Sequence, residues 1–361
     1  MDGIGWFTHE TVRRIVKAHP EHEFLFFFDR KPLPEFIFAD NVKPIVLRPQ
    51  ARHPVLWYMY FEWSVAHALK KYHCDLFLSP DGWMPLVPKT PTLIVIHDLN
   101  FEHADDYLRP SHQRYMKYFF PRFANNATRI ATVSQYSKQD ICATYGIDSD
   151  KIDVVYDGAH EGYRQMGNAA DSATRGGYTN GAPYFIFVST ILKRKNLANL
   201  LLAFDKYKRQ SLQPHKLVVV GRRVWWGDEL ADAYNSMDNK NDVVFVNHAE
   251  PQQLARLMSA ATALVYPSFF EGFGIPIIEA FNAGLPVITS NTTSMPEVAG
   301  DAAILVDPHS ADDIAKALDI VVSDASVRER LIKNGLERRN IFNWDKTAAL
   351  LWDAMNKTLV P

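Results

Sequence analysis

Residues 263–289 read ALVYPSFFEGFGIPIIEAFNAGLPVIT, and this stretch decides the fold class. It begins and ends in short apolar runs, Ala263–Tyr266 and Val287–Thr289, which have the length and composition of buried strands. Between them, Pro276–Ala283 has the apolar spacing of a helix, with proline at its first position. A strand, a loop, a helix and a second strand in so short a stretch predict two parallel strands with the helix packed on their sheet.

The same alternation of short apolar runs and amphipathic segments occurs twice along the chain. In the second half, further strands are expected at Tyr184–Val188, Lys216–Val220, Val243–Val246 and Ala303–Val306. In the first half, strands are expected at Phe24–Phe28, Pro44–Leu47, Leu76–Ser79, Thr92–Ile96, Ile130–Val133 and Ile152–Tyr156. Continuous apolar strands separated by helices indicate parallel sheets that are covered on both faces. The sequence therefore predicts an α/β protein built from two doubly wound, Rossmann-like domains.

Between the two halves, residues 167–183 read GNAADSATRGGYTNGAP and contain no large aliphatic side chain. This composition predicts a solvated linker. We therefore expect an N-terminal domain at 1–166, a C-terminal domain at 184–340 and a terminal segment at 341–361.

The amino end of the chain is unusual for a doubly wound domain. Gly3 and Gly5 have the spacing of a strand-to-helix turn ahead of a helix at Thr8–Ala18, but no strand fits before them. Either the first domain begins without that strand, or the chain is shortened at this end; the sequence leaves both readings open.

The overall composition excludes several classes of protein. The 361 residues include 39 Lys and Arg and 41 Asp and Glu, a net charge of −2, which argues against a general nucleic-acid binder. The two cysteines, Cys74 and Cys142, exclude a disulfide scaffold and favour a reducing cytoplasm. No apolar run approaches the roughly 18 residues that cross a membrane, and the amino end does not resemble a signal peptide.

One aromatic segment, VLWYMYFEW at Val55–Trp63, leaves two interpretations open. With Lys70 and Lys71 after it, the segment could lie on a membrane surface. Its apolar residues nearly encircle a helix, however, which favours burial in the core of the first domain.

Candidate functional residues follow the carboxyl ends of the expected strands, where open α/β sheets bind their ligands. His97 and Asp98 follow one strand of the first half, and Thr190 and Lys193–Lys195 follow the first strand of the second half. Polar, charged and glycine residues thus gather at the edges where two such domains would face each other across a cleft. A histidine that ends a strand can also be an ordinary core residue, and Asp98 can simply cap its own loop.

The cations at Lys193–Lys195 open an expected helix at Leu197–Arg209. Positive charge at a helix N-terminus is unfavourable unless an anion binds there. A phosphate or diphosphate would use both the cations and the free N–H groups of the helix, so we expect such a ligand. The alternative is a solvated basic loop.

Two carboxylates, Glu271 and Glu279, flank the glycine-rich loop of the opening stretch. Each could accept hydrogen bonds from a vicinal diol, one on a sugar and one on a ribose. The glycines between them let backbone N–H groups approach hydroxyls or phosphate closely. The alternative is one capping glutamate and one surface glutamate.

On these residues and on several longer motifs, the chain resembles the family 4 glycosyltransferases. The motifs, which together span nearly the whole chain, are GIGWFT (3–8), VIHDL (95–99), RIATVSQYSKQDI (129–141), KIDVVYDG (151–158), STILKRKNL (189–197), LVVVGRR (217–223) and YPSFFEGFGIPIIEAFNAGLPVITSNTTSMPEVAGDAAILVDP (266–308). The resemblance implies two domains of the glycosyltransferase-B fold, with the last helix returning to the first domain. It also implies transfer of a sugar from a nucleotide sugar with retention at the anomeric carbon.

The resemblance assigns roles to particular residues. Arg194 and Lys195 would neutralise the leaving diphosphate, Glu271 would hold hydroxyls of the transferred sugar, and Glu279 would bind the ribose. His97 matches the active-site histidine of the family. Further donor contacts would come from Gly3, Gly5, Thr190, Gly221, Asn247, His248, Gly272, Phe273, Gly274 and Ile275. Asp98 and Ser134 would lie on the acceptor side, and neither a metal nor a cofactor is expected.

Among relatives with comparable motifs, transfer of mannose from GDP-mannose to a glycan or lipid-linked acceptor is common, so this reaction is the expected one. The protein would be cytoplasmic, with peripheral contact to the inner membrane face as a further expectation. The alternatives are a nucleotide-sugar epimerase on the same fold and a non-catalytic protein that binds nucleotide sugars or glycans. Two departures affect the donor site: an arginine common near Ser189-Thr190 is missing, and Asn247 stands where relatives often have glycine.

Overall fold

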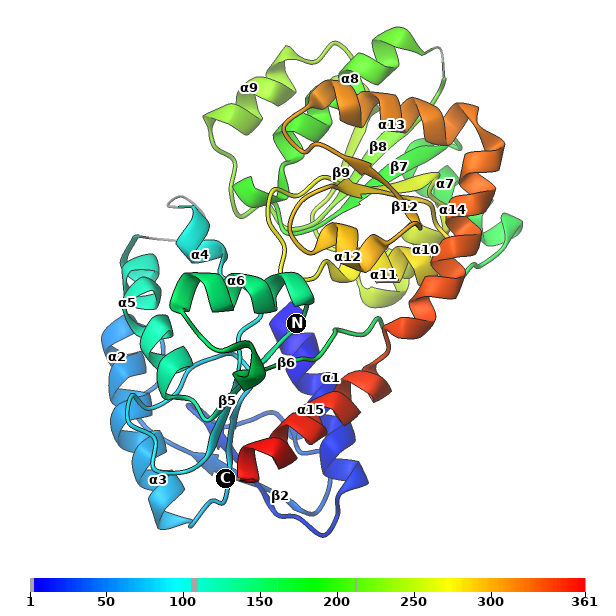
Figure 1. The fold of residues 1–361 in the computed structure, drawn as a ribbon. Helices are drawn as coiled ribbons and strands as arrows, with labels where there is room; N and C mark the ends of the chain where they lie inside the picture. The colour runs from blue at the N-terminus through cyan, green and yellow to red at the C-terminus, as the bar shows by residue number, and fades with distance from the viewer. Residues whose placement is uncertain (1–2, 105–109, 161, 212, 361) are drawn as a thin grey trace. The chain divides into compact units, whose positions relative to one another are not determined.

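The computed structural model describes residues 3–104, 110–160, 162–211 and 213–360 (Figure 1). The chain divides into two compact units, Met1–Gly158 with Asn343–Pro361, and Ala159–Phe342. Over the described residues each unit is an α/β structure whose strand pairs are all parallel, which confirms the predicted fold class.

The second unit contains one parallel sheet of six strands. These are β7 (Tyr184–Val188), β8 (Lys216–Val220), β9 (Val243–Val246), β10 (Ala263–Tyr266), β11 (Val287–Ser290) and β12 (Ala303–Val306). Their order in space is β12-β11-β10-β7-β8-β9. This is the Rossmann order, and the direction of winding reverses between β7 and β10. In sheets of this kind ligands bind at that reversal, beyond the carboxyl ends of the strands.

Helices cover both faces of this sheet (Figure 1). They are α7 (Asn168–Thr179), α8 (Leu197–Gln210), α9 (Asp228–Ser236), α10 (Pro251–Ala260), α11 (Ile275–Asn282), α12 (Met295–Ala299), α13 (Ala311–Ser323) and α14 (Ala325–Arg338), with short 3₁₀ turns at Lys193–Lys195, Lys240–Asp242 and Arg339–Ile341. Helices α8 and α13 pack side by side, and the helical spacing of Leu197, Leu200 and Phe204 turns these side chains into the core. This packing holds the β7–α8 loop, which carries the basic cluster, in place.

The predicted linker at 167–183 is wrong, because the segment forms helix α7 within the second unit. The helix packs on α10, and hydrogen bonds join the two helices. Arg175 donates from Nε to the Ala260 carbonyl at 2.9 Å, and Asp171 accepts from the Ser259 hydroxyl at 2.9 Å. These partners lie far along the chain from α7, so the composition of residues 167–183 alone does not indicate them.

The first unit contains two parallel sheets instead of the single sheet expected. One pairs β1 (Phe24–Phe28) with β2 (Val42–Val46), and the other has the order β3-β4-β5-β6. The strands of the larger sheet are β3 (Phe77–Ser79), β4 (Thr92–Val95), β5 (Arg129–Thr132) and β6 (Ile152–Val154). All five apolar side chains of β1 are only half-buried, although such a run is typical of a strand covered on both faces.

The helices of the first unit are α1 (Gly3–Ala18), α2 (Pro54–Met59), α3 (Ala66–Lys71), α4 (Asn100–His103), α5 (Pro110–Asn126), α6 (Gln135–Tyr145) and α15 (Trp344–Leu359). Short 3₁₀ turns lie at Pro34–Phe36 and Ser149–Lys151, and a π-helical turn at Tyr60–Val65 joins α2 to α3. Helix α1 corrects the expected glycine turn, because Gly3 and Gly5 already lie in its first turn.

The last helix, α15, belongs to the first unit and packs along α1. Arg14 on α1 donates to Asp345 at 2.6 Å, and the rings of His19 and Trp352 stack with centroids 3.7 Å apart. At the start of α15, the Thr347 hydroxyl donates to the Tyr156 carbonyl at 2.7 Å. The segment that precedes the second unit and the segment that follows it are therefore hydrogen-bonded to each other.

The aromatic segment Val55–Trp63 is less buried than its pattern indicates. Tyr60 is buried, but Val55 and Trp63 are 60% and 61% exposed. The helix changes to a π-helical turn at Tyr60, which shifts the later side chains relative to an ideal helix. The preferred interpretation of this segment as core is therefore only partly correct.

Candidate functional site

The main candidate site of the second unit lies where the direction of winding of its sheet reverses, between β7 and β10. Strands β7 and β10 pair with each other in parallel, so the loops that follow them start at the same edge. One loop carries Arg194 and Lys195, and the other carries Glu271. Glu271, more than seventy positions further along the chain, is thereby brought into direct contact with Arg194 and with Lys195.

The centre of this site is a cluster of four side chains, Arg194, Lys195, Tyr266 and Glu271, which we call the switch-point cluster. Lys195 Nζ donates to Glu271 Oε1 at 2.6 Å and to the Tyr266 hydroxyl at 2.8 Å. The Tyr266 hydroxyl in turn donates to Glu271 Oε1 at 2.8 Å. Arg194 Nη1 bridges Glu271 Oε2 at 3.1 Å and the Phe270 carbonyl at 3.0 Å. Two cations thus meet one carboxylate in a fixed arrangement.

The cluster is almost enclosed, since Lys195 and Glu271 are only 8% and 6% exposed. Burial by itself would raise the pKa of Glu271, but the charges of Lys195 and Arg194 and the hydrogen bond from Lys195 lower that pKa to about 2. Burial and the neighbouring carboxylate raise the pKa of Tyr266 well above its usual range. At neutral pH the carboxylate is therefore ionised and the phenol keeps its proton.

Asn196 fixes the two loops that carry the cluster. Its backbone is left-handed, with φ of 60°, and it stands at the start of α8. Its side-chain amide donates to the Pro267 carbonyl at 2.8 Å and to the Pro308 carbonyl at 2.7 Å. A backbone hydrogen bond from Phe269 to the Arg194 carbonyl, 2.8 Å long, joins the same loops. These contacts hold Arg194 and Lys195 over the end of β10.

Gly221 brings the loop after β8 against the loop after β7. Its φ is +150°, and a Cβ atom at this position would lie 1.7 Å from the Ser189 carbonyl oxygen. Only glycine allows this approach. The backbone beside Thr190 is thereby held close to the end of β8.

Glu279 lies on α11, one turn into the helix that Gly274 caps. Among the described residues, its hydrogen-bonding partner is the phenol of Tyr163, and no cation lowers its pKa as Lys195 and Arg194 lower that of Glu271. Burial raises the pKa of Glu279 to about 7, and the hydrogen bond from Tyr163 opposes this rise. The two glutamates of the motif thus sit in opposite electrostatic environments, with one ionised and the other close to its titration midpoint at neutral pH.

The remaining donor-side residues lie around the same sheet edge. Gly272 and Phe273 are buried in the loop after Glu271, and Ser294 donates to the Phe273 carbonyl at 3.1 Å. Ile275 begins α11. Asn247 and His248 follow β9 and are exposed, with His248 3.2 Å from Glu250. Gly3 and Gly5 lie in the first unit and form the first turn of α1, so they are not the loop that was expected.

In the first unit, His97 follows β4 at the carboxyl edge of the four-stranded sheet. Its Nε2 lies 2.9 Å from the Pro80 carbonyl oxygen, and its ring meets Phe7 edge-on with centroids 4.9 Å apart. A carbonyl oxygen can only accept, so Nε2 carries a proton. His97 is therefore held in one orientation at this edge.

The two acceptor-side candidates serve their own loops. One carboxylate oxygen of Asp98 accepts from the Asn100 backbone at 3.0 Å and from the Asn100 side chain. Ser134 is fully buried, and its hydroxyl accepts from the Ser137 backbone at 3.0 Å as the N-cap of α6. That these side chains face an acceptor stays a prediction.

Three residues of the site were not predicted from the sequence: Tyr266, Asn196 and Tyr163. Tyr266 is the last residue of β10, so the same carboxyl-end rule that selected Glu271 could have selected it. Tyr163 carries no local signal, because its contact with Glu279 joins segments far apart in the chain.

Within the described ranges, no group of three or more His, Cys, Asp or Glu side chains is arranged to hold a metal ion. Over the same part of the chain, none of the helices combines the length and the apolar character required to span a bilayer.

Two family models match the chain. Residues 1–161 match the model described as Glycosyltransferase Family 4, and residues 174–338 match the model described as Glycosyl transferases group 1. Among curated proteins, O-antigen chain mannosyltransferase B of Escherichia coli is 27% identical over 356 residues, which is 96% of this chain and 93% of that protein. O-antigen chain mannosyltransferase RfbU of Salmonella typhimurium is 29% identical over 274 residues, 75% of this chain and 72% of that protein.

Solved structures share the fold at low sequence identity. WaaG, a glycosyltransferase involved in lipopolysaccharide biosynthesis, superposes with a TM-score of 0.74 at 15% identity, covering 97% of this chain and 95% of WaaG. Anabaena HepE in complex with UDP and glucose gives a TM-score of 0.75 at 16% identity, covering 98% of this chain and 96% of HepE.

Proposed function

The chain belongs to the family 4 glycosyltransferases with the glycosyltransferase-B fold, and from this premise we propose that it moves a hexose from a nucleotide sugar to an acceptor hydroxyl with retention at the anomeric carbon. The proposed donor is GDP-mannose, and the proposed acceptor is a glycan or a lipid-linked glycan. The two O-antigen mannosyltransferases, which align with most of this chain, support mannose as the sugar.

The switch-point cluster is the observation that carries the proposal. A nucleoside diphosphate that leaves a sugar gains negative charge in the transition state, and preorganised cations in an enclosed site stabilise such charge strongly. Arg194 and Lys195 supply two positive charges at the N-terminus of α8, which also favours an anion. The two cations are already fixed by Glu271 and Tyr266, so little reorganisation is needed when the charge develops.

Glu271 has a supporting role in this scheme. Its carboxylate is held by Lys195, Arg194 and Tyr266, and its low pKa makes it a weak base and a weak nucleophile. We therefore assign it to hold hydroxyls of the transferred sugar while it keeps the cations in place. With no free carboxylate for covalent catalysis in the cluster, the acceptor would attack from the face that the diphosphate leaves, and the phosphate oxygen would take the proton of the acceptor hydroxyl. The two cations would also perform the charge neutralisation for which other enzymes use a metal.

The proposed donor is tested by thermal shift. GDP-mannose at 100 times its Kd should stabilise the protein by about 2.7 kcal/mol, and this shift should persist in EDTA. UDP-glucose and UDP-N-acetylglucosamine, measured in parallel, control for the base and the sugar. A larger rise in stability with a UDP sugar would identify that sugar as the donor in place of GDP-mannose. No rise in stability with any nucleotide sugar would contradict the proposed function. Release of nucleoside diphosphate only when an acceptor is present would separate transfer from epimerisation.

Donor affinity should rise with pH around neutrality. Glu279 is the residue proposed to bind the ribose diol, and its pKa of about 7 means that it is half protonated near pH 7. Only the ionised carboxylate accepts from both hydroxyls, so the donor KM should fall from about pH 6 to about pH 8. Glu279→Gln should have a higher KM that no longer changes over this range. A wild-type KM that is constant with pH would exclude Glu279 from the ribose site.

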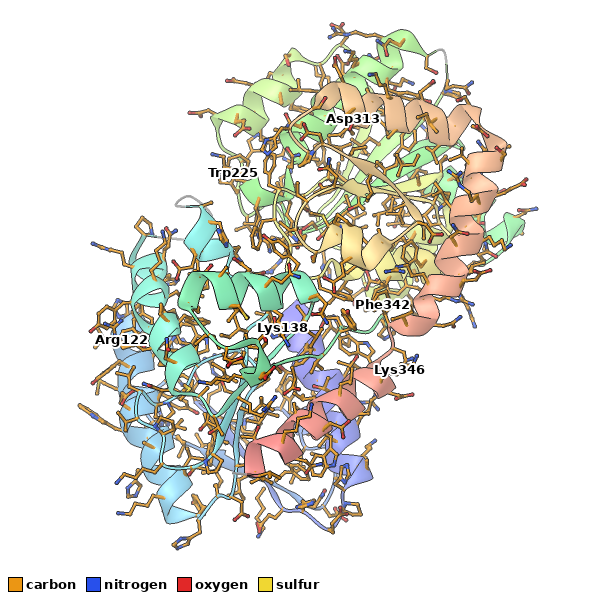
Figure 2. All side chains as sticks on the ribbon, viewed as in Figure 1. Arg122, Lys138, Trp225, Asp313, Phe342 and Lys346 are labelled. Atoms are coloured by element: carbon orange, nitrogen blue, oxygen red, sulfur yellow. The ribbon has the colours of Figure 1, made fainter. Side chains whose placement is uncertain are left out.

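We further propose that the first unit contacts an anionic membrane through an apolar surface formed by Val55, Tyr58, Trp63 and Tyr118. These side chains are 38–61% exposed and lie on α2, the π-helical turn and α5, and α2 packs on α5. The Arg122 guanidinium, labelled in Figure 2, lies over the Tyr118 ring at 3.7 Å from its centroid. Aromatic rings beside cations suit the interface of a bilayer with anionic lipids.

Vesicle sedimentation tests this surface. The protein should sediment with vesicles that contain phosphatidylglycerol, and the double change Val55→Ser and Trp63→Ser should weaken that binding at least about tenfold, because two apolar side chains no longer enter the interface. Val46→Ser, at another half-exposed valine of the same unit, is the matched control and should not change it. Equal binding by the double variant and the wild type would contradict the assignment.

A further inference from the structure

The segment between β6 and α7 carries a buried tyrosine, Tyr163, which is 8% exposed. Its phenol forms a hydrogen bond with the carboxylate of Glu279 on α11. Both residues belong to the second unit, although they lie far apart in the chain. The hydrogen bond lowers the pKa of Glu279, so the phenol is the donor and the ionised carboxylate is the acceptor.

Two further contacts of the same segment hold Tyr163 in place. The Met166 backbone N–H donates to the Ser259 hydroxyl on α10 at 2.9 Å. Gln165 packs over Gly284, which follows α11 directly; the φ of Gly284 is +62°, and a Cβ there would lie 2.2 Å from Gln165 Nε2. The segment is therefore attached to α10 and to the end of α11, which fixes the position of the Tyr163 ring.

Other titratable groups lie on the elements packed against α11, which are α12, α14, the 3₁₀ turn at Arg339–Ile341, β10 and β11. Together with the segment before α7, these elements carry His160, Arg164, Tyr266, Glu297, Arg328, Glu329, Arg330, Lys333, Glu337, Arg338 and Arg339. Tyr266 donates to Glu271, and Arg338 and Arg339 donate to backbone carbonyls. Over the described residues, burial and the hydrogen bond from Tyr163 are what shift the pKa of Glu279.

A phenol donates more strongly to a charged oxygen than to a neutral one, so it favours the ionised form of its partner. The ribose diol requires that form, because only an ionised carboxylate accepts from both hydroxyls. We propose that Tyr163 is a positioning residue for the donor ribose, and that its phenol keeps the Glu279 carboxylate ionised and in place. This inference rests on the proposed function, because it takes Glu279 to be the residue that binds the ribose.

The test measures the Kd of GDP-mannose without acceptor, by calorimetric titration of the full chain from pH 6 to pH 9. Tyr163→Phe keeps the ring and removes the donor, so the pKa of Glu279 should rise by about one unit. The pH at which the affinity reaches half its maximum should rise by the same amount. At pH 7 the variant should bind about fivefold more weakly than the wild type, since about a tenth of its Glu279 is ionised instead of half. Near pH 9 the two should bind about equally.

Tyr184→Phe is the matched control. Tyr184 is also a buried tyrosine of the second unit, and its hydroxyl donates to the Leu257 carbonyl at 2.7 Å. Both variants lose one buried hydrogen bond, but only Tyr163→Phe should move the pH of half-maximal affinity. In Glu279→Gln, which has no carboxylate to titrate, adding Tyr163→Phe should leave the affinity independent of pH. UDP-glucose has the same ribose and replaces GDP-mannose in these titrations if it proves to be the donor.

The outcomes separate this inference from the proposed function. If Glu279→Gln removes the pH dependence but Tyr163→Phe leaves the half-maximal pH at its wild-type value, the role of Tyr163 is overturned and that of Glu279 stands. Affinity weakened by one factor at every pH would likewise overturn it, since Tyr163 would then support only the packing of α11. A wild-type affinity that does not change with pH would exclude Glu279 from the ribose site, and the inference would fall with it.

Discussion

Lys195→Ala is expected to lower kcat by a factor of about 10²–10³, the usual cost of removing one preorganised group that stabilises transition-state charge. Lys195 is nearly buried and is hydrogen-bonded to both Glu271 and Tyr266. After its removal, water cannot easily take over its stabilisation of the negative charge on the diphosphate. The effect should appear in kcat more than in the donor KM, because the charge on the diphosphate grows as the bond to the sugar breaks. Initial rates at saturating donor measure it.

Lys193→Ala is the matched control for this prediction. Lys193 lies in the same 3₁₀ turn, but its Nζ faces Glu229 at 4.0 Å and its side chain is 37% exposed. A surface ion pair of this kind contributes little, so the change in kcat should be small. If Lys195→Ala turned over nearly as fast as the wild type, Lys195 would not be the residue that stabilises charge on the leaving diphosphate.

Glu271→Ala is expected to destabilise the protein by about 3–5 kcal/mol. The substitution leaves the buried Lys195 ammonium without its carboxylate, and an unpaired buried charge costs this much. Urea unfolding of the variant should show a lower midpoint with an unchanged slope.

The double variant Lys195→Met with Glu271→Gln separates the charge from the packing. It removes both members of the ion pair at similar volume, so it should recover much of the stability and remain inactive. Equal stability of Glu271→Ala and the wild type would show that the ion pair is not maintained in solution.

The fold could be predicted from the sequence because its signals are local. Each strand of the second unit is a short apolar run, and α8 shows its core face in the spacing of Leu197, Leu200 and Phe204. Helix α7 was missed, and its hydrogen bonds to α10, from Arg175 to Ala260 and from Ser259 to Asp171, join segments far apart in the sequence.

The candidate site was predicted only in part, for a similar reason. Arg194, Lys195 and Glu271 follow the ends of two strands, and the rule for open α/β sheets brings such loops together. Whether two charged groups then contact a ligand or each other depends on side-chain geometry. The sequence indicates neither the hydrogen bond between Tyr266 and Glu271 nor the contrast between the low pKa of Glu271 and the raised pKa of Glu279.

The central claim is transfer with retention from a nucleotide sugar, and proton NMR of the reaction products tests it most directly. With GDP-α-mannose and an accepted octyl glycoside, the account predicts one α-linked mannoside for each GDP released. A β-linked product, or GDP released in equal amounts with and without acceptor, would contradict it.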